Sequence, residues 1–154
     1  MKEKDNNLNA KVTISLTSIQ WQEREKSETE LITCAELTRT GDGSFVISYE
    51  DTEATGFKGS VTTIKVDNEK SASIIRKGTA NSLLSLEKGR KHFCQYGTPF
   101  GNMQIGVFTH DICNKLCEDG SLYLKYTLDL NSSYLSDNEI ILKIQNPPCS
   151  DIHA

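Results

Sequence analysis

A repeated alternation of apolar and polar residues limits most strongly what this chain can fold into. The clearest case lies near the C-terminus, where apolar residues occupy every second position from Leu122 to Leu130. Successive side chains of a β-strand point to opposite faces, so a period of two predicts a strand with one buried face. Comparable but sometimes more polar patterns predict strands over 11–17, 30–39, 44–50, 60–66, 72–76, 82–87, 92–96, 103–109 and 140–144.

The order of these segments predicts an all-β fold. Turn residues separate the strands, and no strand–helix alternation occurs, which is typical of an antiparallel sandwich or barrel. We favour a single closed barrel of about 8–10 strands, because closure removes exposed sheet edges. Charged residues over 22–30 and a Ser/Asn/Asp-rich stretch after Leu130 are expected to be loops. Residues 110–118, with Ile112 and Leu116 at helical spacing, are the one predicted short helix.

Composition sets the size and the class of the protein. A chain of 154 residues suits one domain, which we expect over 11–146, with a disordered N-terminus over 1–10 and a tail over 147–154. No apolar run approaches the roughly 20 residues of a membrane-spanning helix, and no signal peptide is recognisable, which predicts a cytoplasmic protein. The five cysteines are scattered and odd in number, which favours free thiols over a disulfide framework or a metal site.

The charge is distributed unevenly along the chain. The net charge is −4, yet residues 71–110 hold five basic residues against one acid and therefore carry +4. The rest of the chain carries −8, so a pervasively basic surface for nucleic acid is absent. A local basic patch suits a small anion or an acidic partner, or it only keeps a hairpin tip soluble.

Arg76 is the first candidate for a functional role. Arg76 and Ile74 are two residues apart on one predicted strand, so their side chains lie on the same face. If that of Ile74 points into the barrel, that of Arg76 does too. A buried guanidinium must be paired, and its planar fork fits a carboxylate or a phosphate. The alternatives are a structural pair with an internal acid, such as Glu50, or a solvated arginine at a strand end. The acidic run 50–53 is itself expected to be a solvated strand end.

Three tyrosines and one histidine complete the candidate site. Tyr49 and Tyr126 fall on the apolar faces of their strands, and Tyr96 shares a face with His92 and Cys94. Such rings line pockets, but they also fill the cores of small barrels. His92 and Cys94 would suit thiolate chemistry, yet side chains two apart on a strand are separated by about 7 Å. The standard catalytic motifs are absent, so we assign no catalytic residue.

Several short motifs occur in a fixed order along the chain, at 12–14, 47–50, 75–78, 91–92, 96–101 and 126–129. Together they resemble the YwiB-like family of uncharacterised bacterial proteins over most of the chain. The resemblance implies a calycin-type, lipocalin-like antiparallel barrel in a bacterial cytoplasmic protein, and it supplies no catalytic residues. The Gly-x-Trp signature of secreted lipocalins is missing around Trp21, which argues against extracellular transport of an apolar ligand.

Two functional hypotheses follow, and an enzymatic alternative with a reactive Cys94 beside His92 stays open. In the first, the protein binds a small anionic or amphipathic molecule inside the barrel, through Arg76, Tyr49, Tyr96, Tyr126 and His92. In the second, the barrel is filled with side chains and acts as a protein-interaction module through the basic segment 88–92. Neither hypothesis involves a metal, a cofactor, nucleic acid or a membrane, and both leave the oligomeric state open.

Overall fold

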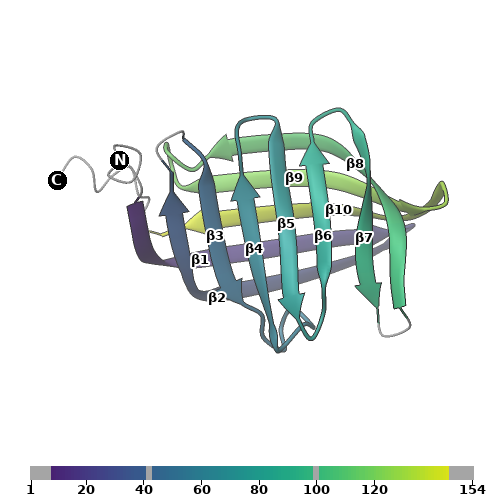
Figure 1. Cartoon of the computed structure of the whole chain (residues 1–154), viewed down its shortest axis with the longest axis horizontal. Coiled ribbons are helices and arrows are strands. Elements are labelled where there is room, and N and C mark those ends of the chain that lie inside the picture. The colour runs from purple at the N-terminus through teal and green to yellow at the C-terminus, as the bar shows by residue number, and fades with distance from the viewer. Residues whose placement is uncertain (1–7, 41–42, 99–100, 146–154) are drawn as a thin grey trace.

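All regular structure in the described part of the protein is β-strand. The computed structural model describes residues 8–40, 43–98 and 101–145. Its ten strands follow one another along the chain (Figure 1): β1 (Leu8–Gln22), β2 (Glu25–Arg39), β3 (Phe45–Glu50), β4 (Ser60–Val66), β5 (Ser71–Gly78), β6 (Ser82–Glu87), β7 (Lys91–Thr98), β8 (Gly101–Lys115), β9 (Ser121–Leu130) and β10 (Ser133–Ile144). The predicted all-β class and strand number are confirmed.

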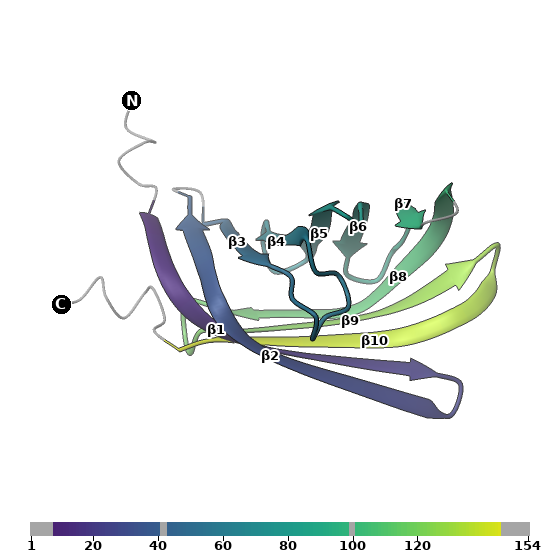
Figure 2. The ribbon, with the colours of Figure 1, turned by 90° about the horizontal axis from the view of Figure 1, so that it is seen from below.

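The strands form a closed antiparallel barrel. Each strand pairs with its neighbours in sequence, and β1 closes the ring by pairing with β10, with Ile14 opposite Ile144. The barrel is flattened into two layers, and β3–β7 cross in front of β1, β9 and β10 (Figure 1). Figure 2 shows the same two layers from below. The predicted closed barrel is therefore confirmed, with its core between the two layers.

The two ends of the barrel differ in character. At the end that carries the β2–β3, β4–β5, β6–β7 and β8–β9 connections, which we call the packed end, large apolar side chains fill the interior. Ten of them are at most 2% exposed: Ile14, Leu37, Ile47, Val66, Leu86, Val107, Leu116, Leu122, Leu142 and Ile144. At the opposite end, which we call the open end, the inward positions become polar.

The charged stretch 22–30 is strand rather than loop, which corrects the prediction. β1 and β2 pair continuously from Leu8–Arg39 to Gln22–Glu25, and only two residues form the turn, of which Glu23 has a φ of 58°. Toward its tip this hairpin diverges from the other strands (Figure 2), and the side chains from Trp21 to Glu28 are exposed, so they have no core to face. Without a buried face, a strand shows no apolar alternation. For the same reason the sequence predicts a loop for the polar start of β10, from Ser133, where the structure has a strand.

The predicted helix over 110–118 is also wrong, because β8 continues to Lys115. A β-bulge between Thr109 and Asp111 adds one residue to β8 relative to β9. The buried positions therefore change from odd to even numbers, from Val107 and Thr109 to Ile112. A bulge inserted into a period of two produces an apolar spacing that resembles that of a helix.

One prediction about the cysteines needs correction. Cys117 is disulfide-bonded, whereas Cys34, Cys94 and Cys113 are free thiols. Spacing in the sequence does not reveal which cysteines approach each other, because a disulfide depends on the distance between Cβ atoms in space. The predicted tail over 147–154 lies outside the described residues. None of the described residues forms a helix long and apolar enough to cross a membrane.

Candidate ligand-binding site

A row of inward-facing side chains crosses five strands of the front layer. The strand register places Tyr49 opposite Thr62, Thr62 opposite Arg76, Arg76 opposite Ser82, and Ser82 opposite Tyr96. We call these five residues the Arg76 row. Directly opposed residues on neighbouring strands have Cβ atoms only about 5 Å apart, so the row forms a continuous polar band.

A second polar row lies on the other layer. Tyr126 is opposite Asn138, Asn138 is opposite Gln20, and Gln20 is opposite Ser27. We call these four residues the Asn138 row. Asn138 donates from Nδ2 to Ser136 Oγ at 3.0 Å, which fixes its amide inside the barrel. The two rows face each other across the interior at the open end.

Both rows line a cavity of ≈ 390 Å³. Below the rows, toward the packed end, its floor is apolar and is formed by Leu16, Leu31, Ile64, Ile74, Leu84 and Ile140. This volume lies within the range of about 300–1,000 Å³ that is typical of small-molecule sites. An apolar floor beneath polar walls suits a molecule that has one apolar and one polar part.

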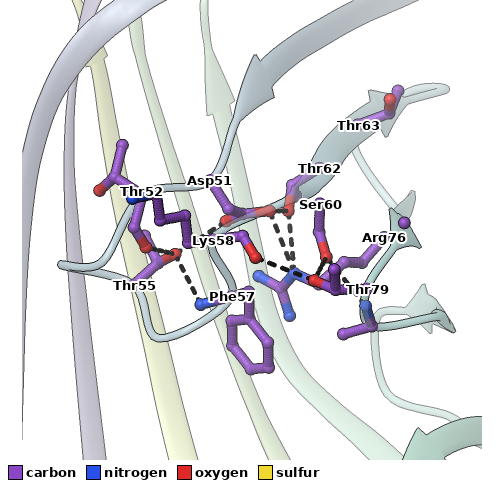
Figure 3. A network of polar contacts seen from close by, with 12 residues as sticks. Asp51, Thr52, Thr55, Phe57, Lys58, Ser60, Thr62, Thr63, Arg76 and Thr79 are labelled. Carbon is purple, nitrogen blue, oxygen red and sulfur yellow. Dashed lines mark hydrogen bonds and ion pairs between the residues drawn. The ribbon is translucent and has the colours of Figure 1, made fainter.

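Arg76 carries the positive charge of the cavity wall. Its side chain is 16% exposed, and its Nε donates to Thr62 Oγ1 at 3.0 Å and to Asp51 Oδ2 at 3.4 Å. Because both contacts use Nε, the terminal Nη groups of the fork point away from Asp51 (Figure 3). The Phe57 ring covers one face of the guanidinium, with Cζ 3.8 Å from the ring centroid. The guanidinium therefore borders the cavity, with Tyr49 as a further hydrogen-bonding neighbour.

Asp51 anchors this arrangement from the loop that follows β3. Its side chain is completely buried, and its Oδ2 accepts from Thr62 Oγ1 at 2.6 Å as well as from Arg76. Its Oδ1 accepts from Thr55 Oγ1 at 3.0 Å, which ties the loop that carries Phe57 to the barrel (Figure 3). The prediction of a solvated acidic run over 50–53 is thus wrong for Asp51, and the internal partner of Arg76 is Asp51 rather than Glu50.

Tyr49 and Tyr126 keep their protons at neutral pH. Burial is the largest cause that raises the pKa of Tyr49 to about 12, outweighing the favourable effect of the nearby Arg76 and Thr62. Burial also raises the pKa of Tyr126 well above its usual value, and the neighbouring Tyr96 adds to this shift. No described residue hydrogen-bonds the hydroxyls of Tyr96 and Tyr126. Neutral phenols beside a guanidinium make this part of the cavity rich in hydrogen-bond donors.

The structure brings together four of the five residues predicted for the site, namely Tyr49, Arg76, Tyr96 and Tyr126. His92 lies elsewhere, toward the packed end, where its Nε2 is 3.0 Å from Glu87 Oε1. It shares strand parity with Tyr96, but parity alone does not specify the level of a residue along the barrel axis. Thr62 was not predicted from the sequence, although its alternation with Ile64 places it on the inward face of the strand. Asp51 and Phe57 could not be predicted in this way, because they lie in a loop, where side chains follow no periodic pattern.

His92 and Cys94 do not form a catalytic pair. Cys94 Sγ accepts from the backbone N–H of Ser85 at 3.3 Å, while His92 contacts Glu87. Burial raises the pKa of the Cys94 thiol, which disfavours the nucleophilic thiolate. Among the described residues, no group of three or more side chains is arranged to hold a metal ion.

The basic segment 88–92 is neutralised by acidic neighbours. Lys88 Nζ is 3.3 Å from Asp111, Arg90 Nε is 3.4 Å from Glu87, and Lys91 Nζ is 2.8 Å from Asp129. An acidic partner would have to compete with each of these carboxylates. The basic segment is therefore less available to an acidic partner than the sequence suggests. The second hypothesis also requires a barrel filled with side chains, whereas this barrel contains a cavity.

Comparison with known proteins identifies the family. The family model described as "Domain of unknown function (DUF1934)" matches residues 14–142. The chain belongs to the DUF1934 family. This match covers every strand of the barrel at least in part, so the family assignment applies to the whole described fold rather than to one motif.

A solved relative supports the same fold. The crystal structure of the ywiB protein from Bacillus subtilis is similar, with a TM-score of 0.69 and 15% sequence identity. The match covers 93% of this chain and 98% of that one. The predicted resemblance to the YwiB-like family is confirmed, and at this identity the likeness concerns the fold alone. A search of curated proteins gave no match.

Proposed function

We propose that this DUF1934 protein binds a small anionic or amphipathic molecule in the cavity at the open end of its barrel. The observation that carries the proposal is the set of donors that line the cavity: the guanidinium of Arg76 and the hydroxyls of Tyr96 and Tyr126. Buried polar groups are normally paired, so tyrosine hydroxyls that face a cavity without a partner among the described residues indicate a missing acceptor. Antiparallel barrels of comparable size can enclose one small ligand, as lipocalins do.

The polarity of the cavity defines how such a molecule would lie. The anionic group binds between Arg76 and the tyrosine hydroxyls, because charge-assisted hydrogen bonds are about twice as strong as neutral ones. The apolar part rests on the floor formed by residues such as Ile64, Ile74 and Leu84. The interaction-module hypothesis is less favoured, since it needs a filled barrel and an unpaired basic segment.

Removing one donor tests this proposal without disturbing the fold. Tyr126→Phe deletes a hydroxyl that has no hydrogen-bond partner among the described residues, so the variant keeps its melting temperature. Tyr123→Phe is the matched control, because Tyr123 lies on the same strand but points outward to Glu139, at 2.7 Å. The probe is anilinonaphthalene sulfonate, an apolar molecule with one negative charge, titrated by fluorescence.

We expect Tyr126→Phe to weaken binding of the probe roughly tenfold, the usual effect of losing one hydrogen bond to a charged group. Tyr123→Phe should bind like the wild type. Equal binding by all three proteins, or no binding by the wild type, would refute the proposed function.

A further inference from the structure

The Asp51 carboxylate lies beside the place where the proposed function puts a negative charge. It is fully buried and 3.4 Å from Arg76 Nε, so water does not screen its charge. An anion bound to the Nη groups of Arg76 would be only a few ångströms further from Asp51 than Arg76 Nε is. The cavity therefore presents an ion pair with no net charge, rather than an isolated cation.

A neutral ion pair discriminates between ligands by their charge. The cost of removing an ion from water rises steeply with its charge, whereas the attraction of a pair rises only in proportion to that charge. A singly charged group can recover its desolvation cost from the donors around Arg76. A doubly charged group loses more hydration and meets stronger repulsion from Asp51.

The shape of the site favours a planar anion. Phe57 stacks on one face of the guanidinium, so a ligand reaches Arg76 along its edge. Two parallel N–H groups at that edge match the two oxygens of a carboxylate. The apolar floor formed by residues such as Leu16 and Leu31 then accommodates a hydrocarbon body.

We propose that Asp51 makes this cavity selective for singly charged amphipathic anions, with a monocarboxylate that carries an apolar body as the ligand class. This inference rests on the proposed function and goes beyond it, because Asp51 sets the charge that the site accepts. Asp51 acts through Arg76 and is therefore a specificity-determining residue rather than a direct ligand contact.

Three probes with the same alkyl chain test the inference by isothermal titration calorimetry: octanoate, octyl phosphate and octanol. At pH 8 the phosphate is mainly doubly charged, because its second pKa is about 6. We expect octanoate to bind at least tenfold more tightly than either of the other probes. At pH 5.5, where octyl phosphate is mainly singly charged, its affinity should rise roughly tenfold or more, while octanoate still carries its charge.

The protein's own groups do not produce that pH dependence. The charged and titratable side chains at the site are those of Tyr49, Arg76, Tyr96 and Tyr126, with Asp51 bonded to Arg76; Glu139 borders the cavity, but its carboxylate accepts from the outward-pointing Tyr123. Histidine is the side chain that ordinarily titrates between pH 5 and 8, and neither His92 nor His110 lines the cavity. A change in octyl phosphate affinity over this range therefore reports the charge of the ligand.

The variant Asp51→Asn removes the charge and keeps the shape. We expect octyl phosphate to bind Asp51→Asn at pH 8 about as tightly as octanoate, whereas the control Asp67→Asn, at the packed end, should behave like the wild type. If Asp51→Asn does not fold, the wild-type pH profile still decides the question.

Equal affinities of octanoate and octyl phosphate at pH 8, or of octanoate and octanol, would overturn the inference and leave the proposed function intact. The same holds if octanoate fails to bind while anilinonaphthalene sulfonate binds. Failure of every probe would overturn both.

Discussion

Asp51 joins the loop after β3 to the cavity wall through a single carboxylate. It accepts hydrogen bonds from Thr55, Thr62 and Arg76, and each of these residues lines the cavity. The loop that carries Phe57 is therefore positioned by the same group that orients the guanidinium. At the scale of residues, the site is one hydrogen-bonded unit rather than a set of independent contacts.

Replacing Asp51 with Ala should therefore be costly for stability. It leaves the Arg76 charge without its partner, and breaking a buried ion pair typically costs 3–5 kcal/mol. Because Arg76 is partly exposed, we expect a loss near the lower limit, about 3 kcal/mol, in urea unfolding. Asp67→Ala is the control, since the pair of Asp67 with Lys65 is exposed and should cost less than about 1 kcal/mol. Equal losses in both variants would show that the Asp51 pair is not structurally important.

The sequence predicts the candidate residues better than it predicts their arrangement. Strand parity correctly placed Arg76, Tyr49 and Tyr126 inside the barrel, because alternation determines the face of a strand. It could not find Asp51, which lies after the strand end, and so Glu50 was suggested as the partner. His92 shows the other limit, since residues on one face can lie at opposite ends of a barrel.

At the scale of elements, the β6–β7 pair is the weakest part of the barrel. Ser82 opposite Tyr96 is its one registered residue pair among the described residues, and Cys94 Sγ takes the place of a backbone acceptor for Ser85. At the open end of the barrel, the Gly97 N–H donates to the Asn81 carbonyl oxygen at 2.7 Å and so holds β7 against the residue that precedes β6. A Cβ atom added at Gly97 would lie 2.3 Å from the Asn81 carbonyl oxygen.

Gly97→Ala should separate these two strands. The clash is with backbone, so it cannot be relieved by a rotamer change, and we expect a destabilisation of about 2 kcal/mol together with faster amide exchange in β6. Gly106→Ala is the matched control on β8, because its Cβ would meet the flexible ends of Lys91 and Asp129. That control should cost less than about 1 kcal/mol. If the amide exchange rates in β6 were unchanged in Gly97→Ala, this account of the β6–β7 pair would be contradicted.

Elements with a buried face were predicted well, and elements without one were not. The central parts of β3, β4 and β9 show clean alternation because one face packs against the core. The β1–β2 hairpin tip has no core to face, and the bulge at His110 changes the period within β8. In both cases a tertiary feature removed the local signal on which sequence reasoning depends.

At the scale of the whole molecule, the barrel is divided into a packed end and an open end. The packed end contains the fully buried residues that stabilise the fold, whereas the open end places two polar rows around a cavity. This division explains why neither a filled barrel nor an empty one describes the protein. It also predicts that ligand binding at the open end leaves the packed end unchanged.

The most direct test of this account is a titration of the ¹⁵N-labelled wild-type protein with octanoate, followed by two-dimensional NMR. We predict chemical-shift changes concentrated at the Arg76 row and the Asn138 row, including Tyr49, Thr62 and Tyr126, with little change over the basic segment 88–92. Shifts confined to that basic segment, or none at millimolar octanoate, would contradict the claim that the cavity is the binding site.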